Sequence, residues 1–267
     1  MRYAVMSDVH ANPQALERAL ADAREQGCAE FVMLGDATGY GYDVAGALAL
    51  VRANFRRVIM GNHDSSCLGR ETRPEALGNP NYDLDRAQAR ELSPEDRKWL
   101  VGRPFVCRLD AAVFVHGELT CPRAWNYILN ERDARVNLRA LAAHEHVLFC
   151  GHTHHAATWS MSPKGRVYSK YEVRLSVPAL REESIAFKLK PGWRYVVNVG
   201  SVGYPRADFC SVYVIYDTEK QQVTYRRLQF NFKYYIDSMI SRGLQLPWWL
   251  EELIARAVRR MRPSSQS

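Results

Sequence analysis

The feature of this sequence that most limits its fold and chemistry is a series of polar clusters, each of which follows a short apolar run. In chain order the clusters are Asp8-x-His10, Gly35-Asp36, Gly61-Asn62-His63-Asp64, His116-Gly117 and Gly151-His152-Thr153-His154. The apolar runs have the length of buried β-strands, so every cluster lies at the carboxyl end of a predicted strand. Ligands of open α/β sheets bind at that end of the strands. We therefore expect the five clusters to meet in one crevice.

Each cluster taken alone has an ordinary structural explanation. A histidine after a strand is often only hydrogen-bonded to its neighbours, and a Gly-Asp pair commonly makes a turn. Successive clusters of this kind, most of them beside a glycine that lets the backbone come close, are much harder to explain as structure alone. The combination favours a site that binds metal ions or carries out catalysis.

The residues around these clusters predict alternating strands and helices. Strands are expected at residues 3–6, 31–34 and 57–60, with helices from Asn12 and Pro13 to Gly27 and over residues 44–54. This alternation predicts parallel strands joined by right-handed crossovers. Two more buried strands are expected at 111–115 and 146–150, with a helix near 133–143 between them.

The pattern changes after Ala156, where strands near residues 156–161, 195–198, 212–216 and 223–228 resemble a second sheet made mainly of hairpins. The predicted fold class is α/β, a four-layer α/β/β/α sandwich of two mixed β-sheets flanked by helices, with a metal site at the carboxyl ends of the strands. Residues 1–230 are expected to form the main domain, in which the polar, proline-broken segment 66–104 is an insertion of helices and loops over the site. Residues 231–267 are expected to form a helical extension of two helices with a frayed tail.

Composition limits where the protein is expected to be located and which partners it is expected to bind. No run of about 18 apolar residues exists, and the N-terminus enters a strand pattern directly, so we expect no membrane span and no signal peptide, and we place the chain in the cytoplasm. The six cysteines lack Cys-x-x-Cys spacing and are expected to be reduced thiols. The net charge of +7 suits an enzyme that attracts anions, but it also suits a protein with an ordinarily charged surface and a basic tail. The C-terminal arginines, Arg256, Arg259, Arg260 and Arg262, are expected to form a solvated outer face, so nucleic acid is not expected as a partner.

The side chains of the clusters limit which metal they could hold. Imidazole and carboxylate groups without thiolate favour Mn, Fe, Zn, Co or Ni and argue against a purely structural zinc. Two neighbouring ions need a bridging carboxylate, and Asp36 is the only acid after the second strand. Asp8, His10 and one histidine of the last cluster could complete one ion. Asn62, His116 and the other histidine could complete the second.

With these residues in view, the chain resembles a known family, the calcineurin-like metallophosphoesterases. The resemblance covers most of the chain and is closest to the small bacterial and archaeal phosphodiesterase branch of that family. The segments that carry it are the five clusters, the loop Gly35-Asp36-Ala37-Thr38-Gly39-Tyr40-Gly41, the strand end Val115-His116-Gly117 and the segment Asn198-Val199-Gly200-Ser201-Val202-Gly203-Tyr204-Pro205-Arg206. Val199 stands where the branch usually has proline, which bears only on the rigidity of that turn.

The resemblance implies a role for each residue of the clusters. Two divalent ions are implied, manganese first with Fe, Zn, Ni or Co as alternatives, one at Asp8, His10, Asp36 and His154 and the other at Asp36, Asn62, His116 and His152. It further implies that His63 is not a ligand but assists the leaving oxygen, with its ring oriented by Asp64. The implied reaction is in-line attack on phosphorus by a hydroxide that bridges the ions, so the predicted function is a binuclear-metal-dependent phosphoester hydrolase.

One loop position bears on the substrate class. Phosphoprotein phosphatases of this superfamily have arginine where this chain has Tyr40, and a guanidinium fork can hold a dianionic phosphate. The tyrosine therefore favours a phosphodiesterase or a phosphoanhydride hydrolase over a phosphomonoesterase. Arg206 is expected either to contact phosphate or to form a surface ion pair. The expected partner is a small phosphorylated, nucleotide-like substrate, and the formation of a homo-oligomer is left open.

A non-catalytic scaffold is the rival prediction from another functional class, since the fold can serve as an interaction module after its metals are lost. Such a scaffold would lack some of the ligands, notably the histidine of Gly-Asn-His. Every ligand position and His63 are present in this sequence, which favours the enzyme.

Overall fold

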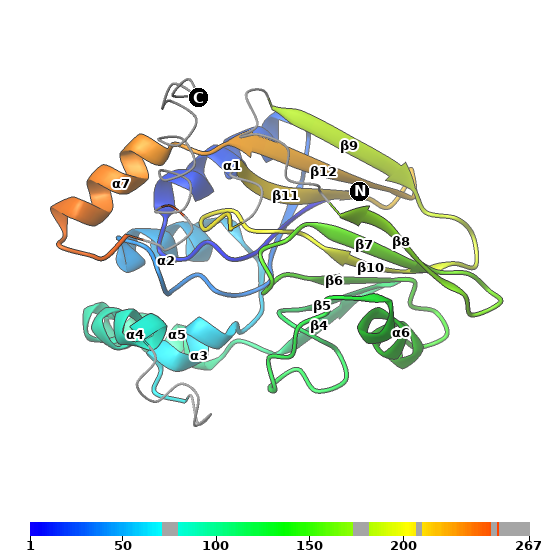
Figure 1. Cartoon of the computed structure of the whole chain (residues 1–267), viewed down its shortest axis with the longest axis horizontal. Coiled ribbons are helices and arrows are strands. Elements are labelled where there is room, and N and C mark those ends of the chain that lie inside the picture. Colours follow the sequence, from blue (N-terminus) through cyan, green and yellow to red (C-terminus); the bar gives the residue numbers. More distant parts are fainter. Residues whose placement is uncertain (71–79, 173–181, 207–209, 247–249, 251–267) are drawn as a thin grey trace, which may run out of the picture. The chain divides into compact units, whose positions relative to one another are not determined.

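The computed structural model describes residues 1–70, 80–172, 182–206, 210–246 and Leu250. Residues 1–230 form one compact unit and residues 231–267 form a second. The first unit contains two six-stranded sheets with helices on their outer sides (Figure 1). All six cysteines are free thiols. Among the described residues, no helix has the length and apolar character needed to cross a membrane.

The first sheet has the strand order β3-β2-β1-β11-β12-β9. Its strands are β1 (Arg2–Met6), β2 (Glu30–Met33), β3 (Arg57–Val58), β9 (Glu183–Lys188), β11 (Cys210–Asp217) and β12 (Gln222–Gln229). Strands β1, β2 and β3 run parallel, as the alternating pattern predicts, and are joined by α1 (Pro13–Glu25) and α2 (Val44–Asn54). Asn12 caps α1 by accepting the amide of Ala15 at 3.2 Å, and Pro13 follows it.

The second sheet has the strand order β4-β5-β6-β10-β7-β8. Its strands are β4 (Val106–Leu109), β5 (Ala112–Val115), β6 (Val147–Cys150), β7 (Ala157–Met161), β8 (Val167–Glu172) and β10 (Arg194–Asn198). Strands β5, β6 and β10 are parallel, and the remaining pairs are antiparallel. Both sheets are therefore mixed.

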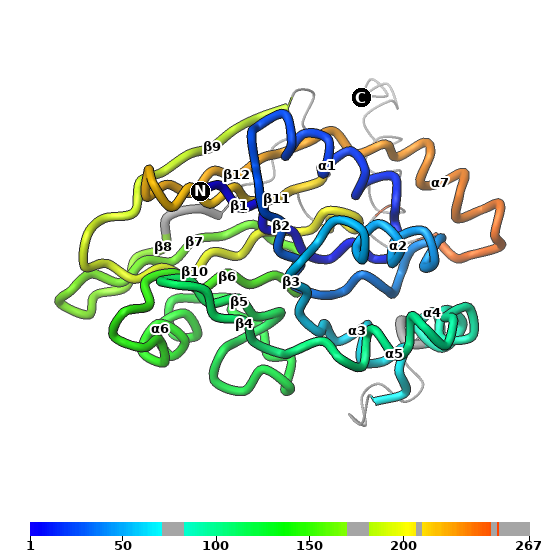
Figure 2. Tube along the Cα trace, turned by 180° about the vertical axis from the view of Figure 1, so that it is seen from behind, coloured from blue at the N-terminus to red at the C-terminus, as the bar shows by residue number. Residues whose placement is uncertain are grey.

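The core lies between the two sheets, and residue alternation along each strand assigns side chains to it. Ala112 and Phe114 of β5 point into the core between the sheets, whereas Val113 and Val115 pack with α6 (Glu131–Ala140) on the outer side. On the first sheet the Tyr213 hydroxyl of β11 donates to Asp22 of α1 at 2.6 Å. Figure 2 shows the two sheets between α1 and α6. The predicted α/β/β/α sandwich is confirmed.

The strands after Ala156 do not form a sheet of their own, which corrects one expectation. Strands β7, β8 and β10 join β4, β5 and β6, while β9, β11 and β12 join the N-terminal strands. Strands β4, β8 and β9 were not expected from the sequence pattern. Each of these three is an outermost strand of its sheet, and most residues of β9 are exposed, so their sequences lack the apolar pattern of a buried strand.

The segment after β3 contains α3 (Asn62–Cys67), α4 (Pro80–Glu91) and α5 (Pro94–Val101), which group at one end of the sheets in both views (Figures 1 and 2). Short helices are thus present in the expected insertion, of which residues 71–79 lie outside the described part of the chain. In the second unit α7 (Phe232–Ser241) is capped by Asn231, which accepts the amide of Tyr234 at 3.1 Å. The second helix expected in the extension lies outside the described residues.

Candidate metal centre

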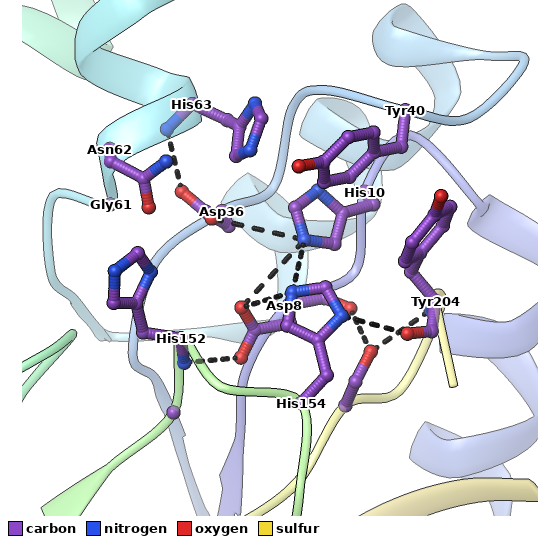
Figure 3. A network of polar contacts seen from close by, with 12 residues as sticks. Asp8, His10, Asp36, Tyr40, Gly61, Asn62, His63, His152, His154 and Tyr204 are labelled. Carbon is purple, nitrogen blue, oxygen red and sulfur yellow. Dashed lines mark hydrogen bonds and ion pairs between the residues drawn. The ribbon is translucent and has the colours of Figure 1, made fainter. Parts of the chain in front are cut away.

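The nine residues singled out in the sequence come together where strands of both sheets end. Asp8 and His10 follow β1, Asp36 follows β2, and Asn62, His63 and Asp64 begin α3 just after β3. His116 follows β5, and His152 and His154 follow β6 of the second sheet. None of the nine is more than 6% exposed. Figure 3 shows most of these side chains converging from separate elements, namely those of Asp8, His10, Asp36, Asn62, His63, His152 and His154.

Three of these side chains form the first half of the centre. His10 Nε2 and His154 Nε2 lie 3.1 Å apart, and Asp8 Oδ1 lies 3.3 Å from His154 Nε2. Asp36 Oδ2 is 3.8 Å from His10 Nε2. These nitrogens and oxygens surround one small volume, as the ligands of a metal ion do.

The second half shares Asp36 with the first. His116 Nε2 lies 3.2 Å from Asp36 Oδ2, 3.0 Å from Asn62 Oδ1 and 3.1 Å from His152 Nδ1. The same carboxylate oxygen of Asp36 therefore faces both groups, which is the position that a bridging ligand occupies.

The four histidines share an arrangement that fixes their tautomers. The ring nitrogen that points away from the centre lies within hydrogen-bond distance of a backbone carbonyl in each case: His10 Nδ1 with Thr38, His116 Nδ1 with Leu34, His152 Nε2 with Trp125 and His154 Nδ1 with Tyr204. Since a carbonyl can only accept, the outer nitrogen carries the hydrogen, and the neutral form of each ring turns a bare lone pair inward. Metal-binding histidines are held in this way.

The protonation states show why a cation suits this arrangement. Burial lowers the pKa of both His10 and His152 to about 3, so both rings are neutral near pH 7. Burial lowers the pKa of His154 too. For His116, burial is outweighed by the adjacent charge of Asp36, which raises its pKa to about 9. Bare nitrogens that face each other at 3.1 Å repel, and a cation between them removes the repulsion.

Two carboxylate oxygens at the centre have no hydrogen-bond partner among the described residues. They are Asp8 Oδ1 and Asp36 Oδ2, and both are buried. The other oxygen of each group is occupied, because Asp8 Oδ2 accepts the amide of His152 at 3.0 Å and Asp36 Oδ1 accepts that of His63 at 2.9 Å. A buried carboxylate oxygen without a donor is costly unless a cation binds it. The residues therefore fit divalent metal ions.

The backbone bends sharply to bring these side chains together. Five of the candidate ligands have left-handed φ angles, namely Asp8 at 56°, His10 at 48°, Asp36 at 56°, His152 at 68° and His154 at 63°. Such angles are unfavourable for residues other than glycine and are characteristic of functional sites. At Gly61 a Cβ atom would collide with the carboxylate of Asp36, which explains why glycine begins this motif.

His63 is oriented by Asp85 of α4 and not by Asp64, which corrects the expectation. His63 Nδ1 lies 2.8 and 2.9 Å from the two carboxylate oxygens of Asp85. Asp64 instead accepts the amides of Asp36 at 2.8 Å and Gly61 at 3.1 Å with one oxygen, and the amide and hydroxyl of Thr38 with the other. Asp64 lies at the start of a helix, where nearby amides attract a carboxylate, so it fixes the loop instead of the ring.

Sequence reasoning missed Asp85 and Gln88, which reach the site from α4. Asp85 is fully buried, and Gln88 accepts the amide of Gly39 at 2.7 Å while donating to the carbonyl of Gly41 at 3.0 Å. Asp85, Gln88 and Leu92 are buried at helical spacing. This spacing could have indicated their role from the sequence. When the buried stripe of an otherwise polar helix contains an acid and an amide, these residues can be expected to support a functional site.

Arg206 forms no ion pair with a described residue, so the surface ion pair considered for it is not found. It is half-buried, and its Nη2 donates to the Tyr40 hydroxyl at 3.2 Å.

Comparison with known proteins places this chain in a family. A model described as the calcineurin-like phosphoesterase superfamily domain matches residues 1–221. The chain is 26% identical over 255 residues to an uncharacterized protein of Methanocaldococcus jannaschii, with 93% of this chain and 95% of that protein covered.

Two solved structures share the fold. A metallophosphoesterase from Sphaerobacter thermophilus is 29% identical, with a TM-score of 0.74 over 92% of this chain and 95% of that one. A hypothetical protein from Pyrococcus horikoshii is 16% identical, with a TM-score of 0.66 over 91% of this chain and 94% of that one. The chain belongs to the calcineurin-like phosphoesterase superfamily.

Proposed function

We propose that this protein hydrolyses small phosphoesters with the help of two divalent metal ions, and that its substrates are phosphodiesters or phosphoanhydrides. The observation that carries the proposal is the single oxygen, Asp36 Oδ2, that faces both His10 at 3.8 Å and His116 at 3.2 Å without a hydrogen-bond partner among the described residues. We assign one ion to Asp8, His10, Asp36 and His154, and the other to Asp36, Asn62, His116 and His152.

The residues of the chain have separate tasks in this proposal. Bound divalent ions would lower the pKa of a water molecule and neutralise charge that develops on phosphate. His63 would donate a proton to the leaving oxygen from Nε2, because Nδ1 faces Asp85 at 2.8 Å. Asp36 also holds the backbone of this proton donor, since its Oδ1 accepts the amide of His63.

The preference for diesters or anhydrides rests on the loop residue Tyr40. Its ring contacts His10 and His63, with ring centres 4.7 and 4.4 Å apart. Burial raises the pKa of the Tyr40 hydroxyl, so this side chain is neutral at pH 7. A phosphomonoester dianion carries a second anionic oxygen on the reacting phosphorus. Because Tyr40 is neutral, it cannot pair with that charge.

The experiment that tests the proposal is an activity screen with defined metals. Purified protein, stripped of metal and reloaded with Mn, Fe, Zn, Co or Ni, would be assayed on bis-p-nitrophenyl phosphate, p-nitrophenyl phosphate, 2′,3′-cyclic nucleotides, dinucleoside polyphosphates and a phosphopeptide. We expect the diester or anhydride substrates to have the highest kcat/KM, and Asp36→Asn to abolish it. Turnover confined to the phosphopeptide would favour a phosphoprotein phosphatase, and no turnover with any metal would favour a scaffold.

A further inference from the structure

Arg206 lies on a stack of two tyrosines beside the centre. It belongs to the loop between β10 and β11, whereas Tyr40 comes from the loop after β2. The rings of Tyr40 and Tyr204 are stacked, with centres 4.4 Å apart and planes 18° apart. The guanidinium carbon of Arg206 lies 5.7 Å from one ring centre and 5.8 Å from the other. The stack therefore fixes where this charge sits.

The charge of Arg206 has no anionic partner within the described residues. Its one hydrogen bond there goes to the neutral hydroxyl of Tyr40, and its Nε is buried without a partner. By contrast Arg226 and Arg227, which are buried, each pair with a carboxylate. Removing a guanidinium from water without a counter-charge costs free energy. An arginine kept in this state fits an anion that arrives with the substrate.

The position of this charge relative to the histidines indicates which anion it can reach. The Tyr40 ring contacts both groups, since its centre lies 4.7 Å from that of His10 and 5.7 Å from the guanidinium carbon of Arg206. Tyr204 lies against His154, with ring centres 5.5 Å apart. Arg206 thus contacts the two tyrosines that touch candidate ligands, but among the described residues it has no direct hydrogen bond or ion pair with a ligand. That position suits an anionic group next to the reacting phosphate more than the reacting phosphate itself.

We propose that Arg206 binds a second phosphate group beside the one that is hydrolysed, so that the preferred substrate is a phosphoanhydride and not a simple diester. The inference rests on the proposed function and narrows it. A guanidinium is therefore present on this side of the site even though Tyr40 is not arginine. It is that of Arg206, which the tertiary structure brings to the Tyr40 hydroxyl from the loop before β11.

The kinetic test compares substrates with and without a neighbouring phosphate. Arg206→Gln would be assayed on a dinucleoside tetraphosphate and on bis-p-nitrophenyl phosphate. We expect its loss of kcat/KM on the tetraphosphate to exceed its loss on the diester by roughly tenfold or more, as for a lost charge-assisted hydrogen bond. Arg166→Gln is the matched control, since Arg166 also lies over a tyrosine, 5.3 Å from the ring centre of Tyr168, but on the β7–β8 hairpin. Equal losses on both substrates would overturn the inference.

A binding test separates this inference from the proposed function. Calorimetry would measure how tightly metal-loaded protein binds inorganic phosphate and imidodiphosphate, with the metal content checked before and after. We expect Arg206→Gln to weaken the binding of imidodiphosphate about tenfold more than the binding of phosphate. Arg206→Lys keeps the charge but not the planar fork, so its affinity for imidodiphosphate should lie between those of Arg206→Gln and the wild type. If the variants hydrolyse diesters but bind both anions as tightly as the wild type does, the second phosphate site is refuted and the hydrolase function is not. Selective imidodiphosphate binding without any turnover would support the site and refute the hydrolase.

Discussion

The carboxylate of Asp85 lies 2.8 Å from Nδ1 of His63, and this contact joins α4 to the first turn of α3. Both side chains are almost completely buried. The contact makes Asp85 a positioning residue for the histidine that we assign to proton donation, although 22 residues separate the two in the sequence.

Replacing Asp85 should impair proton donation without removing metal. We expect Asp85→Asn to lower kcat by roughly 10- to 100-fold, less than His63→Ala, because general acids contribute about 10²- to 10⁴-fold. The loss should grow as the leaving group becomes more basic. Asp83→Asn, an exposed acid on the same helix, is the control and should behave as the wild type. A loss that is equal for all leaving groups would contradict this role.

The same variant should change the pH profile in a defined direction. Burial lowers the pKa of His63, but the charges of Asp85 and Asp36 outweigh it and raise that pKa above its usual value. Activity that needs protonated His63 falls as pH rises through this pKa. In Asp85→Asn the pKa should drop, so the alkaline limb of kcat against pH should move to lower pH. An unmoved alkaline limb would argue against His63 as the acid.

The two central roles of Asp36 and His63 can be separated by metal analysis. Asp36→Asn should lose bound metal and activity together, because Oδ2 faces both halves of the centre. His63→Ala should retain metal and lose turnover, because its ring is held by Asp85. Elemental analysis of the purified variants checks both. Retained metal in Asp36→Asn, or metal loss in His63→Ala, would overturn the assignments.

Asp64 should matter for stability more than for proton transfer. Its two oxygens accept three backbone amides and one hydroxyl, so Asp64→Asn places an amide group against donors. We expect the free energy of unfolding to fall by roughly 2–3 kcal/mol, as for buried donors left unpaired. Urea unfolding of the metal-free protein measures this directly. A variant with wild-type stability would show that the loop does not depend on these bonds.

Metal binding should stabilise the folded protein. The unpartnered oxygens of Asp8 and Asp36 and the facing histidine nitrogens are relieved only when a cation is present. At a metal concentration of about 100 times Kd the gain is about 2.7 kcal/mol, which raises Tm by roughly 5–10 °C in a domain of this size. Thermal unfolding with Mn and with a chelator gives the comparison, and Asp36→Asn should show no difference between the two.

Acid stability should depend on Asp22 of α1, which belongs to none of the clusters that form the centre. Burial raises its pKa, but hydrogen bonds from Arg226 at 2.9 Å and Tyr213 at 2.6 Å outweigh burial and lower it. A lowered pKa means that Asp22 stabilises the fold above its unfolded pKa of about 3.9, and that this contribution disappears as pH falls through the folded value. We expect Asp22→Asn to lose roughly 2 kcal/mol at pH 7, because Arg226 then keeps only the more distant carboxylate of Glu182, 3.9 Å away. The difference from the wild type should shrink toward pH 2.

The sequence by itself determined the candidate donor set of the centre and the order in which the strands present it. Asp8, Asp36 and His116 each follow a short apolar run, and the ends of such strands meet wherever a parallel sheet forms. Donor type and position after a strand are local properties, so they can be read without knowing the partners of each strand.

Only the tertiary structure decided which strands share a sheet and which side chains complete the site from a distance. Asp85 reaches His63 from another helix, and Arg206 reaches Tyr40 across 166 residues. Strand β9 joins the first sheet and β8 the second, although both are polar edge strands. These contacts depend on how buried faces pack after long loops close, and loop closure leaves no periodic pattern in the chain.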